Sequence, residues 1–141
     1  MMRRILIPFI QSEDIEDILK KIDNYDYKGG QFYLVRLIEE EAAMLVARSM
    51  GKDHNALISE LEEEGWSALY FFQEEFKKKG INLRISLKIG NSVKDLIGAV
   101  KEYGIELVLF SRREADGMRM QAKEKVVEHL MMDSDAMIMI I

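Results

Sequence analysis

The sequence predicts an α/β protein with a doubly wound, five-stranded parallel sheet in a three-layer sandwich. Two observations support this prediction. Five short apolar runs alternate with segments of helical periodicity, and four of these runs are almost continuously apolar. Strands covered by helices on both faces have this composition. Strands that alternate with helices form parallel sheets with right-handed crossovers.

The five apolar runs are the predicted strands. In chain order they are Ile5 to Ile10, Phe32 to Ile38, Ile81 to Ile89, Ile105 to Phe110, and Ala136 to Ile141. In the third run, apolar and polar residues alternate strictly, so one of its faces is expected to meet solvent. We therefore predict that this strand lies at an edge of the sheet.

Helical periodicity predicts four helices between these strands. They cover Glu13 to about Asn24, Asp53 to Lys79, Ser92 to Gly104, and roughly Arg119 to Met132. We predict Ser92 as an N-cap with Asp95 in the capping-box position, because a serine followed three residues later by an acid is typical of a helix start. Gly29 and Gly30 provide the turn into the second strand.

Length and composition limit the class of protein. The 141 residues fit one domain over 1–141. The absence of cysteine excludes disulfides, thiol catalysis and thiolate metal sites. A net charge of −5 argues against binding to nucleic acid or to anionic membranes. The first apolar run is too short to span a membrane, and no small-residue cleavage site follows it, so we expect a cytoplasmic protein.

The fold class also predicts where a ligand would bind. Doubly wound sheets bind ligands outside the carboxyl ends of their strands. Three segments are expected to surround one cleft there: Ile10-Gln11-Ser12, Glu39-Glu40-Glu41, and Ser111 to Glu114. The fold alone does not imply an activity.

Three stretches of the sequence point to a known family. They are RRILIPFIQSE at residues 3–13, GNSVKDLIGAVKEYGIELVLFSRR at residues 90–113, and the closing VVEHLMMDSDAMIMII. Over nearly its whole length the chain resembles the universal stress proteins, and the middle stretch is the most specific part. The resemblance implies an adenine-nucleotide alpha-hydrolase-like fold with strand order 3-2-1-4-5. It also implies a stress-linked binding or regulatory role and a homodimer formed through the last strand.

In ATP-binding members of that family, an Asp after the first strand contacts adenosine. A Gly-x2-Gly-x9-Gly-(Ser/Thr) signature after the fourth strand cradles the phosphates. In this chain the Asp position holds Ile10. The signature positions hold Ser111, Glu114, Glu124 and Lys125, so the spacing is kept and every functional residue differs.

These exchanges oppose phosphate binding. Glycine is used in phosphate loops because it lets the backbone approach the anion closely. Glu114 and Glu124 add side chains and charges of the wrong sign, and two like charges about 4 Å apart repel by roughly 1 kcal/mol even in water. We therefore predict a degenerate nucleotide site without ATP or any other cofactor. The family cleft positions are Pro8, Ile10, Ser12, Leu37, Ser111, Arg112, Arg113, Glu114, Glu124 and Lys125.

Other candidates for a site are weaker. Arg112 and Arg113 are open to two interpretations, an anion site or solvated side chains paired with nearby acids. The two histidines, His54 and His129, lie in different predicted helices, so we predict no metal site. Ser12 has no predicted base beside it and is expected to be an N-cap, so we predict no catalytic residue.

Two surfaces are predicted for partners. The last strand is wholly apolar, and such an edge is prone to aggregate unless another subunit covers it. We predict a dimer interface at Ala136, Met137, Ile138, Met139 and Ile140. Trp66 and Tyr70 form either an exposed patch for a protein partner or a packed rim.

The sequence therefore favours a stress-linked binding or regulatory protein, a homodimer with an unknown small molecule or protein partner. Two alternatives stay open. One is an ATP- or AMP-binding protein with slow ATPase activity that uses the altered loop. The other is a structural dimer module without a ligand.

Overall fold

The computed structural model of the chain describes residues 3–10, 13–24, 29–112 and 121–141. Its five strands form one sheet in the order β3-β2-β1-β4-β5, and every neighbouring pair is parallel. The predicted strand order 3-2-1-4-5 is confirmed. The strands are β1 (Arg4–Phe9), β2 (Gln31–Glu39), β3 (Leu83–Gly90), β4 (Leu107–Phe110) and β5 (Met137–Ile140).

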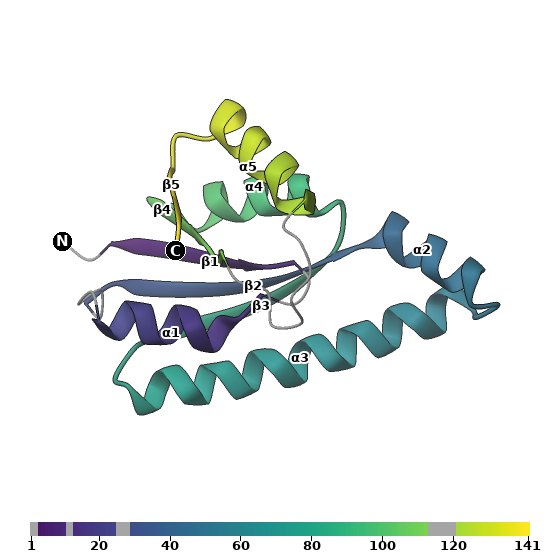
Figure 1. The fold of residues 1–141 in the computed structure, drawn as a ribbon, viewed down its shortest axis with the longest axis horizontal. Coiled ribbons are helices and arrows are strands. Elements are labelled where there is room, and N and C mark those ends of the chain that lie inside the picture. Colours follow the sequence, from purple (N-terminus) through teal and green to yellow (C-terminus); the bar gives the residue numbers. More distant parts are fainter. Residues whose placement is uncertain (1–2, 11–12, 25–28, 113–120) are drawn as a thin grey trace.

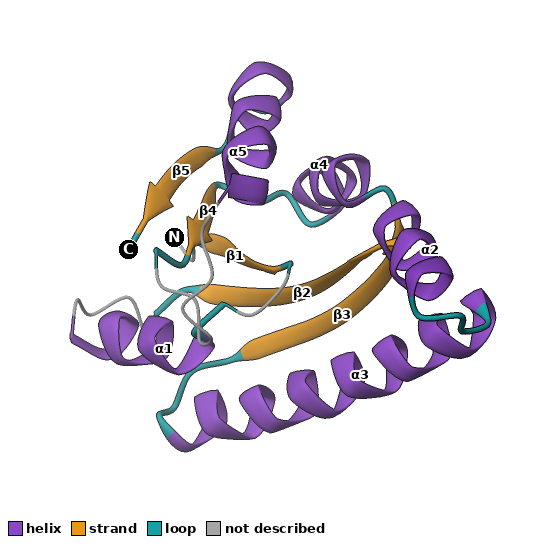
Figure 2. Cartoon of the chain, turned by 45° about the vertical axis from the view of Figure 1, so that its right-hand side comes forward, coloured by secondary structure: helices purple, strands orange, loops and turns teal. Residues whose placement is uncertain are grey.

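Helices cover both faces of this sheet, which makes the three layers of the sandwich (Figure 1). One face carries α1 (Ile15–Asn24) and the long α3 (His54–Lys78), and the other carries α4 (Ser92–Glu102) and α5 (Gln121–Asp133). A fifth helix, α2 (Glu40–Ser49), continues directly from β2 and extends beyond the end of the sheet (Figure 2). No helix in the described part of the chain is long and apolar enough to cross a membrane.

The two faces of the sheet bury separate apolar cores. Along β2, Phe32 and Leu34 belong to the core under α1 and α3, whereas Tyr33 and Val35 belong to the core under α4 and α5. Successive residues of a strand point to opposite faces, so a strand in the middle of the sheet must be apolar throughout. This is the physical reason for the continuous apolar runs in the sequence.

Gly65 lets α3 lie close to the sheet. A Cβ atom at this position would come within 2.7 Å of Leu87 Cδ1 and 3.2 Å of Arg36 Cγ. Real Cβ atoms essentially never come within 3.0 Å of another heavy atom, so the Leu87 side chain would have to move to admit one. Glycine in the middle of this helix therefore serves its contact with β2 and β3.

The sheet ends in β3 on one side and β5 on the other. The edge position predicted for the third strand from its alternation is confirmed. β5 is held to β4 beyond the strand itself, because Arg112 N–H donates to the Ile141 carbonyl over 2.7 Å and Ile141 N–H donates to the Phe110 carbonyl over 3.0 Å.

Two sequence-based predictions were wrong. The sequence did not predict α2, because apolar residues also occur on the exposed side of this helix and weaken its periodicity: Met44 and Leu45 are exposed. The N-cap of α4 is Asn91, not Ser92, because the Asn91 side chain accepts a hydrogen bond from Lys94 N–H over 3.1 Å. Ser92 is instead the first residue of the helix and is buried.

Candidate functional site

A cleft of about 710 Å³ lies at the carboxyl ends of β1 and β2, where α2, α3, α4 and the start of α5 meet. Pockets that bind small molecules typically measure about 300–1,000 Å³. The cleft lies where a doubly wound sheet places its ligands. The described residues that line it are Ile10, Arg36, Ile38, Glu39, Ala42, Ala43, Val46, Leu57, Leu61, Ser92, Val93, Lys125 and Val126.

The lining of the cleft is mainly apolar. Among its described residues, only four carry polar side chains: Arg36, Glu39, Ser92 and Lys125. The other side chains are aliphatic, and three of them come from α2. An apolar wall with a few converging polar groups is the usual composition of a small-molecule site.

Glu39 precedes α2 directly and contacts the first residue of α4, so it connects these two helices beside the cleft. It ends β2, and its Oε2 accepts a hydrogen bond from Ser92 N–H over 2.8 Å. The first backbone N–H groups of a helix have no partner within the helix, and the helix dipole favours a negative charge beside them. The carboxylate of Glu39 therefore already occupies the amino end of α4, where an anionic ligand would otherwise be attracted.

Arg36, on the neighbouring strand β2, forms hydrogen bonds to the end of β1. Its Nη1 donates to the carbonyl oxygens of Phe9 (3.2 Å), Ile10 (2.5 Å) and Leu37 (2.8 Å). Its guanidinium carbon also lies 5.1 Å from the centre of the Phe9 ring, within the range of a cation–π contact. The Arg36 guanidinium thus donates to two carbonyls at the end of β1 and to one carbonyl within β2.

Two carboxylates accompany this guanidinium. Burial lowers the pKa of Arg36, and the negative charges of Glu13 and Glu64 oppose that shift. Glu13 is itself buried, and its Oε2 accepts a hydrogen bond from Ile10 N–H. The backbone around Ile10, where the family's adenosine-binding Asp would lie, is therefore bound on both its N–H and C=O sides by the protein's own charged side chains.

The structure brings only some of the sequence-predicted cleft residues together. Ile10 and Lys125 line the cleft, although they come from opposite ends of the chain. Three other predicted residues, Pro8, Leu37 and Ser111, are buried and are not among the described lining residues. Arg112 is exposed. Ser12, Arg113 and Glu114 lie outside the described residues, and only the backbone of Glu124 is described.

Sequence reasoning did not identify Arg36 or Glu13 as parts of this site. A signal for Arg36 was present, because it is the only charged residue inside the apolar run from Phe32 to Ile38. A charge in a strand that is covered on both faces requires a partner. Nothing in the sequence shows that this partner would be the turn after β1.

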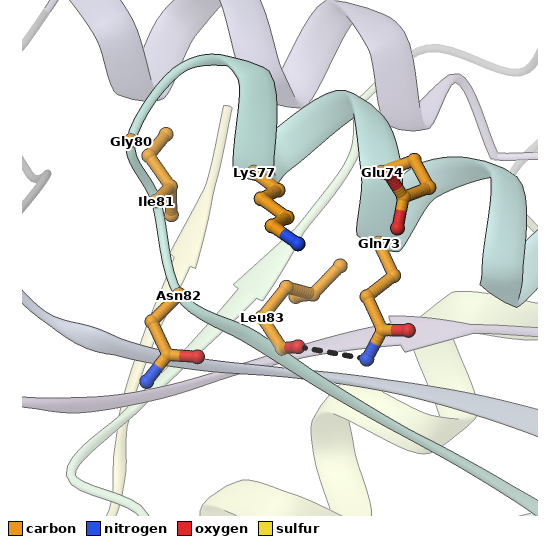
Figure 3. Close-up of a pocket in the computed structure, with 7 residues that line it drawn as sticks. All are labelled: Gln73, Glu74, Lys77, Gly80, Ile81, Asn82 and Leu83. Atoms are coloured by element: carbon orange, nitrogen blue, oxygen red, sulfur yellow. Dashed lines mark hydrogen bonds between the residues drawn. The ribbon is translucent and has the colours of Figure 1, made fainter.

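A second hollow, of about 440 Å³, lies at the opposite end of β3 (Figure 3). Its walls come from α3 and from the turn into β3, and Gln73 Nε2 donates to the Leu83 carbonyl over 3.3 Å. This contact covers a backbone group of an edge strand, which would otherwise be open to pairing with another chain. Lys77 and Glu74 are exposed, so the hollow lacks the buried polar groups of a built site.

Trp66 packs as a rim, whereas Tyr70 is exposed, and its role as a patch for a protein partner stays a prediction. The Trp66 ring lies 5.8 Å from that of Tyr70 and packs, half-buried, against the core on the α3 face. Tyr70 is 58% exposed and lies next to the 50% exposed Phe71. The described residues contain no cluster of three or more His, Asp or Glu side chains that could hold a metal ion.

Comparisons with known proteins show the fold. No protein-family model and no curated protein matches the sequence. Among solved structures, a hypothetical protein that was the subject of a structure-based assignment of biochemical function is 18% identical. Its TM-score is 0.76, and the match covers 100% of this chain and 96% of that chain.

Two further matches are named universal stress proteins. A family member from Burkholderia pseudomallei is 15% identical with a TM-score of 0.63, and the match covers 96% of this chain and 94% of that chain. A family protein from Arabidopsis thaliana, solved with AMP bound, is 15% identical with a TM-score of 0.61, over 99% of this chain and 90% of that chain. The chain therefore has the fold of the universal stress proteins.

Proposed function

We propose that the chain is a small-molecule-binding module of the universal stress protein type, whose cleft takes a mainly apolar ligand in place of ATP. Its role is regulatory and stress-linked, and occupancy of the cleft is the signal. The observation that carries this proposal is the cleft of about 710 Å³ with an aliphatic lining. A polar, multiply charged phosphate chain has few partners on such a surface.

The charged groups of the site support the same proposal. Glu39 occupies the amino end of α4, and Arg36 is engaged with backbone carbonyls. The sequence adds Glu114 and Glu124 at positions where the family uses glycine. An anion that enters this cleft would therefore find the amino end of α4 already occupied by Glu39 and the Arg36 guanidinium already engaged with backbone carbonyls.

Mg-ATP is therefore expected to bind weakly or not at all. Titration calorimetry near neutral pH should give a dissociation constant above about 1 mM, which corresponds to less than about 4 kcal/mol of binding free energy. A constant in the low micromolar range would instead favour a nucleotide-binding protein, and ATP turnover would then be measured. AMP should be titrated in parallel, because it carries less charge and is the ligand named for the Arabidopsis thaliana structure.

Filling the cleft is expected to abolish binding of an apolar probe. The uncharged dye N-phenylnaphthylamine becomes fluorescent in apolar sites, and it should bind the native chain. Ala42→Trp places an indole into the cleft from α2 at an exposed position, so the fold should tolerate it. We expect dye affinity to fall at least about tenfold, equivalent to about 1.4 kcal/mol.

The matched control is Ala56→Trp, an exposed alanine of α3 that is not among the described lining residues. It should bind the dye like the native chain. If the native chain does not bind the dye, or if both variants bind it equally, the cleft is not a ligand site. The alternative of a structural module without a ligand would then be favoured.

We also propose that the module acts as a homodimer through β5. Met137 and Ile140 are exposed on this edge strand, and the described residues include no strand on its outer side. An edge of this kind pairs with its own copy across a twofold axis.

A further inference from the structure

Ser92, in the lining of the cleft, has a buried hydroxyl without a hydrogen-bond partner in the described part of the chain. Ser92 is only 5% exposed, and its Oγ makes no hydrogen bond to any residue that the structure describes. Burying a hydroxyl group without a partner costs roughly 1–3 kcal/mol, so such groups are rare in folded proteins. Ser92 is also one of the described residues that line the cleft. A molecule in the cleft is thus a candidate partner for this hydroxyl, once a rotation about the Ser92 Cα–Cβ bond turns Oγ toward it.

The charges around Ser92 restrict what that partner can be. The backbone N–H of the same residue binds the Glu39 carboxylate, so an anionic group at Oγ would lie beside a negative charge. Arg36 and Lys125 also line the cleft, so a cationic group would meet two positive charges. A buried charge needs a dedicated counter-ion, and the described lining of the cleft carries charges of both signs.

A neutral polar group avoids both penalties. A hydroxyl group can donate to a carboxylate or to Ser92 Oγ, and it can also accept a hydrogen bond from the Ser92 hydroxyl. The aliphatic walls contributed by α2, α3 and α4 would surround the rest of such a molecule. Each methylene group moved there from water contributes about 0.8 kcal/mol.

We propose that the cleft selects a neutral amphiphile, with an aliphatic body against α2 and α3 and an uncharged hydroxyl group hydrogen-bonded to Ser92 Oγ beside Glu39. This inference rests on the proposed function, because it requires the cleft to be a ligand site. It adds the chemical class of the ligand and the residue that recognises its polar group.

The test compares three molecules that share one tail: n-octanol, octanoate and octylammonium. Each displaces N-phenylnaphthylamine from the native full-length chain at neutral pH, below its aggregation concentration. n-Octanol is expected to compete at least about fivefold better than either charged molecule, since desolvating a charge costs more than desolvating a hydroxyl. Equal competition by all three, or stronger competition by octanoate or octylammonium, would overturn the proposal.

Ser92→Ala tests the recognising atom. The dissociation constant of n-octanol is expected to rise about fivefold more than that of the dye, which corresponds to the loss of one hydrogen bond. Free Ser92→Ala protein should melt no lower than the native protein, because an unpartnered buried hydroxyl has been removed. Ser67→Ala, at an exposed position of α3 outside the described lining, is the control.

The outcomes separate the two proposals. If the dye does not bind the native chain, the proposed function fails. If the dye binds and Ala42→Trp blocks it, but Ser92→Ala changes n-octanol and dye binding equally, the ligand class proposed here is wrong and the binding function stands. A Ser92→Ala protein that melts several degrees lower would assign Ser92 a structural role and would also overturn the proposal.

Discussion

Replacing Arg36 by leucine is expected to lower the free energy of unfolding by about 3–5 kcal/mol, which is the range observed when one partner of a buried charge pair is removed. Leucine leaves the carbonyl groups of Phe9, Ile10 and Leu37 without their donor. It also removes a positive charge that acts on the buried carboxylate of Glu13. Native domains are stable by only about 5–15 kcal/mol, so this single change should unfold a large fraction of the protein on mild heating.

Denaturation in urea, followed by circular dichroism, measures this effect. The matched control is Arg84→Leu on the neighbouring strand β3, where the arginine is exposed and the change should stay within about 0.5 kcal/mol. A loss below about 1 kcal/mol for Arg36→Leu would mean that the contacts around Ile10 do not hold the end of β1.

Ile140→Lys is expected to convert the proposed homodimer into monomers. Ile140 lies on edge strand β5 and is 39% exposed, so the lysine ammonium group can reach water in the monomer. In a dimer paired through β5, two such charges would be buried against each other across the twofold axis. The loss should exceed about 3 kcal/mol per dimer, or more than a hundredfold in the dissociation constant.

Sedimentation equilibrium of the native chain and of the variant measures the association. Leu45→Lys is the control, because Leu45 is 65% exposed on α2 and α2 lies far from β5 in both views of the fold (Figures 1 and 2). It should leave the dimer intact. If folded Ile140→Lys protein sediments as a dimer, the interface lies on another surface. Ile138 is unsuitable for this test, because it packs against the core under α4 and α5.

The sequence determined the sheet. The strands of the core are apolar on both faces because helices cover both faces, and this requirement appears directly as continuous apolar runs. The third strand alternates apolar and polar residues, which predicts that one of its faces is not covered by a helix. This pattern placed the strand at an edge of the sheet. Apolar residues recur along the sequence with the period of a strand or a helix wherever one side of that element is buried. The sequence pattern is therefore enough to predict which residues form the core.

Helix starts were less well determined. Asn91 and Ser92 are adjacent, and both are good N-cap residues, so sequence could not choose between them. In the structure the Asn91 side chain caps the helix, and the Glu39 carboxylate, at the end of β2, accepts a hydrogen bond from the N–H of Ser92, the first helical residue. α2 escaped prediction because only Ala43 and Ala47 of the helix are buried, and two alanines give a weak apolar stripe.

The candidate site was determined mainly by tertiary structure. Sequence placed Ile10 and Lys125 in one cleft through the resemblance to universal stress proteins, and both line it. The partners of Arg36 are the carbonyls of Phe9 and Ile10, which lie 27 and 26 residues away along the chain. Such contacts depend on the register of β1 against β2, in which Phe9 lies opposite Arg36. The sequence pattern shows which residues are apolar. The register of paired strands decides which polar groups come into contact, and these contacts make up the site.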